Sequence, residues 1–493
     1  MWRVFCNLFI AAAGAGLLSY PYAVKHQGML LCVALTGLFG LLNIFTDYVL
    51  LQTAYLFREK LGGKGGPGFD SLVLHALGPG QSRLAGASIV LGALGAQIGY
   101  LIAIGDLLCP PLQAATRCPG SGPLCALTSR VAVVPAVAFS VTLPLTFFTS
   151  PMSLGHSSAL AAATVLAVCA VVAAQGFSAL AHTPGLAVVG STAAYPSADS
   201  PAALVLSRWT MGVFLGIPIS VFSLGNHMQI IPLYLASSPS VQARFPAVVT
   251  AAVASCVALY LVTGLLGYCA YRAGTAGDIM LNLPDNSVTA VGKVVLAVHL
   301  LLSYPVLFFP SKRSLLAAAG EAAAWLRERQ GAAGAEGGGL LARACQYSST
   351  SPIVIPLLAT AVSAFLAVAA PSISVVFGLL GATVATYQIY FIPGLLLLKF
   401  AEAMEGRGQG TWATAPSVWG RGQEELQQLL AAGEEAGEAS SGVALAEPPR
   451  PCLLPLGSAA LTRALAYLLL LLSVAIGCCG TVVYILSTWF AWG

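Results

Sequence analysis

Long apolar stretches dominate this sequence and permit only one class of fold. Eleven stretches contain about 20 mostly apolar residues each, the length that a helix needs to cross the hydrocarbon core of a bilayer. They are twice as long as the strands of a membrane barrel and lack the period-2 alternation of such strands. The sequence therefore predicts an all-α, multipass membrane protein with eleven transmembrane helices. The stretches run roughly over 4–24, 29–55, 84–108, 131–149, 155–177, 209–233, 246–271, 288–310, 352–370, 373–398 and 460–488.

The scarcity of charge supports the same fold class and excludes others. The 493 residues include 22 Lys and Arg and 18 Asp and Glu, so only 8% carry a formal charge, against about 25% in soluble domains. Apolar residues make up 57% of the chain, and the mean hydropathy is +0.84. A net charge of +4 is too small for a surface that follows nucleic-acid phosphates. We expect the lipid bilayer as the surrounding partner, no nucleic acid, and a monomer.

The distribution of Lys and Arg predicts the orientation of the helices. With the N-terminus in the cytoplasm, 16 of the 22 basic residues fall in cytoplasmic connectors, as the positive-inside rule requires. The first apolar stretch is followed by ten more, so we expect it to be retained rather than cleaved as a signal peptide. No targeting signal is legible, and a plasma membrane and a vacuolar or lysosomal membrane both fit.

Two long connectors on the predicted cytoplasmic side differ in composition from the spans. Residues 313–350 are rich in Ala, Gly and Glu, and we expect a short surface helix around Leu315–Arg329. Residues 401–457 are rich in Gly and Glu and poor in aromatic residues, so we expect a disordered insert. The chain then divides into a core at 1–400, this insert, and a last span with the C-terminus at 458–493.

Three cysteines share one predicted non-cytoplasmic loop. Cys109, Cys118 and Cys125 flank a Pro-containing segment, and one disulfide among them is expected, with the pairing left open. No CxxC pair or His-rich tract is present, so we expect no metal cofactor.

Helix-breaking residues occur at mid-depth in two of the spans. The first span contains Gly14-Ala15-Gly16, and the sixth contains Pro218 followed by Phe222-Ser223-Leu224-Gly225-Asn226-His227. Each break lies in the first span of a set of five, within inverted repeats at about 1–177 and 209–398. Paired broken helices of this kind form the substrate site of inverted-repeat transporters. The alternative is that the glycines only permit close packing of helices.

The polarity of a broken helix indicates what it binds. A half-helix that starts near Gly16 presents free N–H groups and the positive end of its dipole, which suit a carboxylate. The unwound carbonyl groups before it suit a cation or an ammonium group.

The order of motifs along the chain resembles the amino acid/auxin permease family, and most closely the neutral amino acid transporters of the system A/N type. The resemblance covers about residues 1–400 and the last span. It rests on the following segments: Asn7-Leu8 with Gly14–Ala23, Gly99–Asp106, Leu143-Pro144-Leu145, Asn226-His227 with Pro232-Leu233-Tyr234, Gly264–Tyr268, Asp278–Pro284, Ser303-Tyr304-Pro305, and Pro371–Thr383 with Pro393-Gly394.

The resemblance implies a LeuT-like fold and secondary active transport of amino acids by alternating access. The substrate carboxylate would bind the N–H groups of Ala15, Gly16 and Leu17, beside Gly14. The amino group would meet the carbonyl groups of Ala12 and Ala13 and those around the second break. The second-break residues are Phe222, Ser223, Gly225 and Asn226. Neither break contains Asp, Glu, Lys or Arg, so an ionised substrate side chain would lack a counter-ion. A neutral amino acid is the expected substrate.

The resemblance also implies a coupling cation between the first and eighth spans. Its ligands would be the carbonyl groups of Ile10, Ala13 and Leu300 and the hydroxyl group of Ser303. Sodium-coupled relatives carry Asn at the position of Ile10, and Ile offers no side-chain oxygen. The gradient that drives transport, H⁺ or Na⁺, is therefore open at this point.

His227 and Asp47 are candidates for a proton relay. Histidine titrates near neutral pH, and Asp47 is a carboxylate well inside a span, where ionisable residues are commonly functional. For Asp47 a structural hydrogen-bonding role fits equally well, and for His227 the structural role is favoured. His299 in the eighth span is expected to be structural, and Gln97 and Gln388 are expected to hydrogen-bond between helices.

Other functional classes remain as alternatives. A membrane enzyme would need a catalytic motif, and the chain has no His-box, no G-x-S-x-G and no Walker A lysine. A channel would need rings of charge or a filter motif, and is less favoured. A sensing receptor on the same fold remains, because binding and transport share one site.

Overall fold

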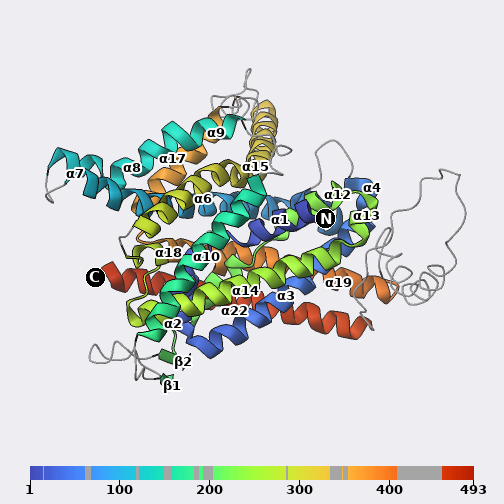
Figure 1. Cartoon of the computed structure of the whole chain (residues 1–493). Helices are drawn as coiled ribbons and strands as arrows, with labels where there is room; N and C mark the ends of the chain where they lie inside the picture. Colours follow the sequence, from blue (N-terminus) through green and yellow to red (C-terminus); the bar gives the residue numbers. More distant parts are fainter. Residues whose placement is uncertain are drawn as a thin grey trace, which may run out of the picture.

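The computed structural model describes most of the chain. The described residues are 1–14, 16–61, 68–117, 122–148, 157–182, 188–192, 204–284, 287–332, 347, 353–407 and 458–492. Within them the chain is almost entirely helical, with long helices packed side by side (Figure 1). The predicted insert at 401–457 lies outside the described residues after Arg407.

Eight helical segments of the described chain are long and apolar enough to cross a membrane. They are formed by α3 (Met29–Leu56); α6 (Pro79–Ala115); α8 (Arg130–Val137) with η1 (Ala138–Thr142) and α9 (Leu143–Phe148); α10 (Ser157–Ala181); α11 (Val213–Ser223) with α12 (His227–Leu235); α14 (Phe245–Tyr271) with η3 (Arg272–Gly274); α18 (Ile373–Leu380) with η5 (Gly381–Ala385), η6 (Tyr387–Phe391) and α19 (Ile392–Met404); and α22 (Ala459–Trp492).

The prediction of a helical multipass protein agrees with this count, but the number eleven is not confirmed. A ninth span results if α1 (Trp2–Ala12) and α2 (Gly16–Gln27) are taken as one bent pair. Two further apolar segments, Thr289–Leu301 within α15 (Ser287–Ala332) and α17 (Val354–Ala369), occupy predicted stretches but are shorter.

The helices differ in how deeply they lie in the bundle. In α6, 72% of the apolar window is buried, whereas the value for α22 is 28%. Large apolar side chains such as Leu468, Leu471 and Val474 of α22 are exposed, as expected for a surface that contacts lipid rather than water. The inner position of α6 places it beside α5 (Phe69–Leu77), α15, α17 and α18.

Short elements close the two ends of the bundle. At one end lie α4 (Arg58–Leu61) and α13 (Pro239–Ala243), near the N-terminus in Figure 1. At the other end lie α7 (Pro123–Leu127) and two strands (Figure 1). The short helix η4 (Ile279–Leu281) contacts α2 and α6.

The two strands correct the all-α prediction. Strands β1 (Val188–Thr192) and β2 (Leu204–Arg208) pair in parallel, with Val188 opposite Leu204. The backbone of β2 packs against the turn at Gly28, where a Cβ atom would lie 2.7 Å from the Cα atom of Ser207. Gly28 also has φ of +80°, a conformation that favours glycine. The pair was missed because five-residue strands give no signal in a search for spans of about 20 residues.

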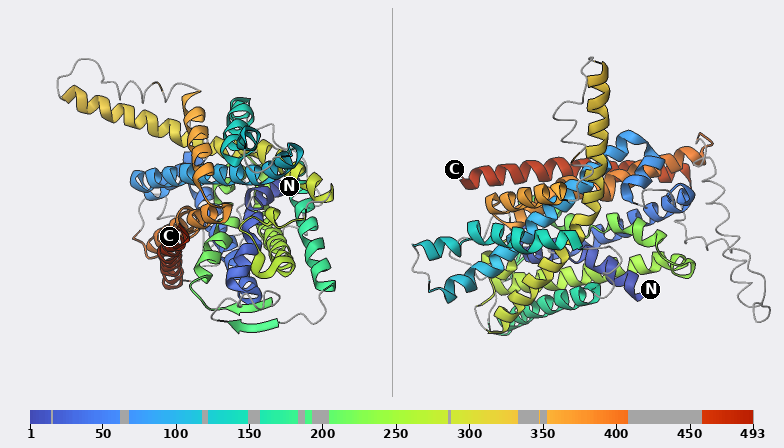
Figure 2. Two further views of the ribbon diagram at one scale, coloured as in Figure 1. Left: turned by 90° about the vertical axis from the view of Figure 1, so that its left-hand side faces the viewer. Right: turned by 90° about the horizontal axis from the view of Figure 1, so that it is seen from above.

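The predicted surface helix at Leu315–Arg329 is the end of a much longer one. Helix α15 runs without interruption over 46 residues, from Ser287 to Ala332, and its last part projects from the bundle (Figure 2). Residues 315–329 consist largely of Ala, Leu, Glu and Arg, which are strong helix formers. They therefore extend the membrane helix instead of starting a new one.

Candidate functional site

The first predicted break is present. Helix α1 ends at Ala12, α2 begins at Gly16, and their axes differ by 51°. Across the gap, the Gly14 N–H donates to the Ala12 carbonyl (2.9 Å) and the Leu17 N–H donates to the Gly14 carbonyl (3.2 Å). Ala15 lies outside the described residues. The ends of two helices, each with main-chain groups that have no intrahelical partner, thus lie in the protein interior.

The second break is the end of α11 at Ser223 and the start of α12 at His227. The Gly225 N–H donates to the Phe222 carbonyl (3.1 Å), and the Ser223 hydroxyl donates to the Ile219 carbonyl (2.7 Å). The ring of Phe222 stacks on that of Phe377, with centroids 4.6 Å apart. Helix α11 is therefore fixed to α18 immediately before the chain leaves the helix.

The two breaks meet at Gly16 and Ser223. A Cβ atom at Gly16 would lie 2.5 Å from the Ser223 Oγ atom and 3.1 Å from the Ser223 Cα atom. A Cβ atom at Gly14 would lie 3.5 Å from the Tyr100 hydroxyl of α6. Glycine at position 16 is thus required by a close approach of two interrupted helices. Main-chain groups and the hydroxyl groups of Ser223 and Tyr100 lie close together there.

The Ala12 carbonyl, assigned by resemblance to the substrate amino group, already has partners. It accepts a hydrogen bond from the Tyr260 hydroxyl (2.5 Å) as well as from the Gly14 N–H (2.9 Å). Tyr260 lies in α14 and stacks on Tyr20 of α2, with ring centroids 4.7 Å apart. Tyr260 therefore connects both halves of the first broken span. A ligand would reach this carbonyl only by displacing its hydroxyl.

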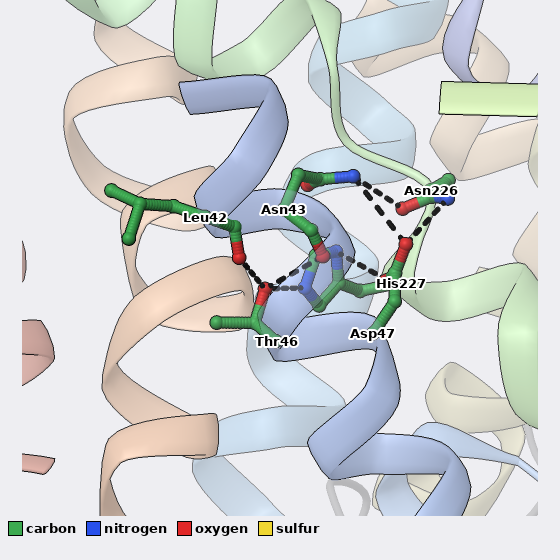
Figure 3. Close-up of polar contacts among 6 residues, drawn as sticks. All are labelled: Leu42, Asn43, Thr46, Asp47, Asn226 and His227. Carbon is green, nitrogen blue, oxygen red and sulfur yellow. Dashed lines mark hydrogen bonds and ion pairs between the residues drawn. The ribbon is translucent and has the colours of Figure 1, made fainter. Parts of the chain in front are cut away.

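A buried polar network joins the second break to α3 (Figure 3). The Asn226 amide donates to Asp47 Oδ2 (2.9 Å), and the Asn43 amide donates to Asn226 Oδ1 (3.1 Å). His227 Nε2 lies 2.9 Å from the Thr46 hydroxyl, and His227 Nδ1 lies 3.4 Å from Asp47 Oδ1. Asn226, predicted to contact the substrate, thus directs its side chain toward α3 in this structure.

The network brings together the two residues predicted as proton-relay candidates. Asp47 and His227 are separated by 180 positions in the sequence, yet they are neighbours in space. Their side chains are 0% and 1% exposed, respectively. Sequence reasoning named both residues but did not predict that they form a pair.

A small cavity lies beside the first break. It is lined by Gly14, Leu17 and Leu18 of the first span and by residues of α10 and α15, which are Val165, Val168, Leu296, His299 and Leu300. Of the cation ligands implied by the resemblance, Leu300 lines this cavity, whereas Ile10 and Ser303 do not. The Ser303 hydroxyl lies 3.5 Å from His299 Nε2. The cavity is mainly apolar.

Some functional candidates were not found from the sequence. Tyr100 and Tyr260 contact the first break from α6 and α14, and only their positions in space reveal this. Asn43 did carry a signal, because it lies four residues before Asp47 on one helix face.

The bonds predicted between helices are present for both glutamines. The Ser363 hydroxyl donates to Gln97 Oε1 (3.3 Å), and the Gln388 amide donates to the Ser88 hydroxyl (3.0 Å). These two residues therefore connect α6 to α17 and to η6, and the structural interpretation is confirmed.

The structure tests part of the disulfide prediction for the three loop cysteines. Cys125 is disulfide-bonded, whereas Cys109 is a free, buried thiol. Cys109 therefore does not take part in the predicted bridge. It lies inside the last turns of α6. Cys118 lies outside the described residues.

Comparison with known proteins identifies the family. A family model described as transmembrane amino acid transporter protein matches residues 1–415. The chain belongs to this family. The family is one of transporters rather than enzymes, so multipass insertion in a membrane follows from family and helices together.

Relatives of this chain include longer proteins. Solute carrier family 38 member 10 of Homo sapiens is 23% identical over 412 residues, which are 81% of this chain and 32% of that protein. The Mus musculus protein of the same name is 23% identical over 321 residues, 64% of this chain and 26% of that protein. The chain thus spans about a third or less of the length of the curated relatives it matches.

A solved structure of low similarity also aligns with this chain. It is a manganese transporter of Eremococcus coleocola, in the mutant H236A, with 12% identity and a TM-score of 0.44. The alignment covers 98% of this chain and 94% of that one.

Proposed function

We propose that this chain is a secondary active transporter that moves neutral amino acids across a membrane by alternating access. The observation that carries the proposal is the contact of the two breaks at Gly16 and Ser223. Main-chain N–H groups at the start of α2 suit a carboxylate. Residues 12–16 are all Ala or Gly, so no large side chain of this segment would stand between its backbone and a small ligand.

The charge distribution favours a neutral substrate. Residues 12–17 and 222–227 contain no Asp, Glu, Lys or Arg. The carboxylate nearest to the second break, Asp47, already accepts a hydrogen bond from the Asn226 amide. An ionised substrate side chain would be buried without a partner, at a cost of several kcal/mol.

The test is uptake by the purified protein in liposomes. Radiolabelled amino acids of the neutral, acidic and basic classes are offered with a proton gradient, with a sodium gradient and with neither. We expect saturable accumulation of neutral amino acids that depends on a cation gradient. Preferred accumulation of acidic or basic amino acids would contradict the substrate class.

The rival functions give different results in the same assay. An amino acid-sensing receptor on this fold would bind the ligand without accumulating it. A channel would equilibrate the ligand without saturation or concentration against a gradient.

A substitution at the contact tests the site itself. Gly16→Val places a branched side chain against the Ser223 backbone, so we expect uptake to fall at least tenfold while the protein remains in the membrane. Gly86→Val is the matched control, because a Cβ atom at Gly86 in α6 meets nothing within 4 Å. Normal uptake by Gly16→Val would show that the substrate does not bind at this contact.

A further inference from the structure

Two buried hydrogen-bond acceptors face each other between α3 and α12. Asp47 Oδ1 and His227 Nδ1 lie 3.4 Å apart, and neither atom has a hydrogen-bond partner within the described part of the chain. The other carboxylate oxygen, Asp47 Oδ2, accepts from the amides of Asn226 (2.9 Å) and Asn43 (3.4 Å). The carboxylate is thus saturated on one side and open only toward the imidazole ring.

Thr46 determines which imidazole nitrogen is the acceptor. The Thr46 hydroxyl has one proton, and it donates to the main-chain carbonyl groups of Leu42 (3.0 Å) and Asn43 (3.1 Å). Its oxygen can therefore only accept from His227 Nε2, 2.9 Å away. A neutral imidazole ring carries one N–H, so the hydrogen-bond network assigns it to Nε2. The lone pair of Nδ1 then faces the carboxylate.

One proton converts this unfavourable arrangement into a hydrogen bond. Two facing lone pairs in a dry interior repel each other, and a buried carboxylate oxygen without a donor is unfavourable. A proton on either Asp47 Oδ1 or His227 Nδ1 makes a donor–acceptor pair at this position. We propose that Asp47 and His227 together bind one proton, and that this proton is the coupling ion of the transport cycle. The second part of the proposal rests on the proposed transport function.

The surroundings of the pair favour a proton over a metal cation. Sodium prefers several hard oxygen ligands, but the open side of Asp47 faces an imidazole nitrogen, and amide N–H groups occupy its other side. All polar contacts of the pair lie within α3, Asn226 and α12 in the described chain. Titratable side chains of the neighbouring elements make none with it. They include Cys6 of α1, Tyr20 of α2, Arg58 of α4, Asp70 and His75 of α5, Arg208 of β2, Cys256 and Tyr260 of α14, Tyr387 and Tyr390 of η6, and Lys399 and Glu402 of α19.

Asn226 connects the proton site to the substrate site. It is the last residue of the second break, three residues after the Ser223 that contacts Gly16. With the proton bound, α3 and α12 are held together through Asn226 and His227. When the proton leaves, the opposed acceptors disfavour this contact, and α12 is released from α3. Because coupling between two sites is reciprocal, a substrate bound at the breaks changes the affinity of the pair for the proton.

The test separates substrate exchange from proton movement. Purified protein is placed in liposomes that contain a pH-sensitive dye, and the probe is a mixture of radiolabelled neutral L-amino acids. Counterflow exchange at equal pH reports the substrate site alone. A pH gradient without a membrane potential then reports coupled accumulation, and the dye reports proton movement.

For the wild-type protein we expect exchange, accumulation driven by the pH gradient, and proton movement triggered by the amino acids. In Asp47→Asn, a side-chain amide supplies permanently the donor that the proton would supply. We expect this variant to keep exchange but to lose gradient-driven accumulation and proton movement at least tenfold. His227→Gln is expected to show the same separation. Asp106→Asn is the matched control at another carboxylate of a membrane helix, and it should behave as the wild type.

The outcomes are distinct. Absence of exchange in the wild-type protein would overturn the proposed transport function and the coupling role with it. Wild-type exchange with accumulation driven by sodium alone would overturn the proton as coupling ion. Retained proton movement in Asp47→Asn would show that the proton binds at another site. If neither variant is obtained in folded form, the test uses the wild-type protein in detergent. The amino acid mixture is added, and proton uptake or release is measured. Absence of any proton uptake or release would overturn the proposal.

Discussion

The hydroxyl group of Tyr260 donates a 2.5 Å hydrogen bond to the carbonyl oxygen of Ala12, the last residue of α1. The same ring stacks on Tyr20 of α2. One side chain of α14 therefore contacts the first span on both sides of its break. This contact holds the buried C-terminal end of α1 in place, and it identifies Tyr260 as a residue that a substrate must displace in order to reach the Ala12 carbonyl.

Removal of this hydroxyl should weaken the break without destroying the fold. In Tyr260→Phe the Ala12 carbonyl keeps its bond from the Gly14 N–H, so we expect a loss of about 1 kcal/mol in the free energy of unfolding. Denaturant unfolding of the purified variant measures this loss. Tyr48→Phe, which removes a hydroxyl bonded to Thr250, is the comparison for a bond away from the break. Transport kinetics should change in Tyr260→Phe and not in Tyr48→Phe.

The contact between the breaks can be tested by a compensating pair. Gly16→Ala places a methyl group 2.5 Å from the Ser223 Oγ atom, 3.0 Å from its Cβ atom and 3.1 Å from its Cα atom, and we expect uptake to fall strongly. Ser223→Gly removes the two nearest of these atoms. The double variant Gly16→Ala with Ser223→Gly should therefore recover part of the uptake lost in Gly16→Ala. A double-mutant cycle on initial uptake rates measures the interaction, and purely additive losses would argue against direct contact.

The tautomer of His227 makes a prediction about Thr46. Thr46→Val removes the acceptor that fixes the N–H group on Nε2, so the ring can place its N–H on Nδ1, facing Asp47, without an added proton. We expect gradient-driven accumulation to fall at least tenfold while counterflow exchange persists. Thr46→Ser keeps the hydroxyl group and should keep coupling. Equal behaviour of the Val and Ser variants would mean that Thr46 does not set the tautomer.

The connector between α14 and α15 should respond to pH. Asp278 is buried there, and its Oδ1 atom accepts from the Met280 N–H (2.8 Å). Burial, and to a lesser extent Asp106, raises the pKa of Asp278 from 3.8 to about 7, whereas the Met280 N–H and Lys293 act in the opposite direction. The connector is held to α2 by bonds from Ser19 to the Gly277 carbonyl (2.9 Å) and from Lys25 to the Thr275 carbonyl (3.0 Å).

The sign of this effect follows from the raised pKa. The folded state keeps the proton on Asp278 between pH about 4 and 7, whereas the unfolded chain loses it, so stability from this group is present below about pH 4 and is lost as the pH rises through about 7. We expect hydrogen exchange of the amides in 275–283 to accelerate over this range beyond the intrinsic pH dependence of exchange. Asp278→Asn should abolish this extra increase. An unchanged profile in Asp278→Asn would assign the response to another group.

The sequence predicted the parts of the molecule that depend on local pattern. The apolar stretches mark the helices, and Gly14, Gly16 and Gly225 mark the places where two of them are interrupted, because these signals lie within about 20 residues. Strands β1 and β2 escaped because each is only five residues long. The continuation of α15 beyond its apolar stretch was not predicted. Strong helix formers follow that stretch, and no helix-stop signal lies between them.

Contacts between distant segments could not be predicted from one chain. The pairing of Asp47 with His227, of Tyr260 with Ala12 and of Gly16 with Ser223 depends on how α3, α14 and α11 pack against the first and sixth spans. Composition and spacing say nothing about such packing. For Asp47, depth in the membrane was enough to name it as a candidate but not to name its partner.

The two halves of the sixth span are held by different means. The Tyr484 hydroxyl of α22 donates to the Leu215 carbonyl of α11 (2.6 Å), and the backbone of η5 at Gly381 packs directly on the backbone of Pro218. Helix α12 is bonded to α3 by the polar network around Asp47, and its Ile230 and Ile231 are buried in the apolar core. In the proposed transport cycle, α11 would therefore stay in place, and α12 would move relative to it about Gly225.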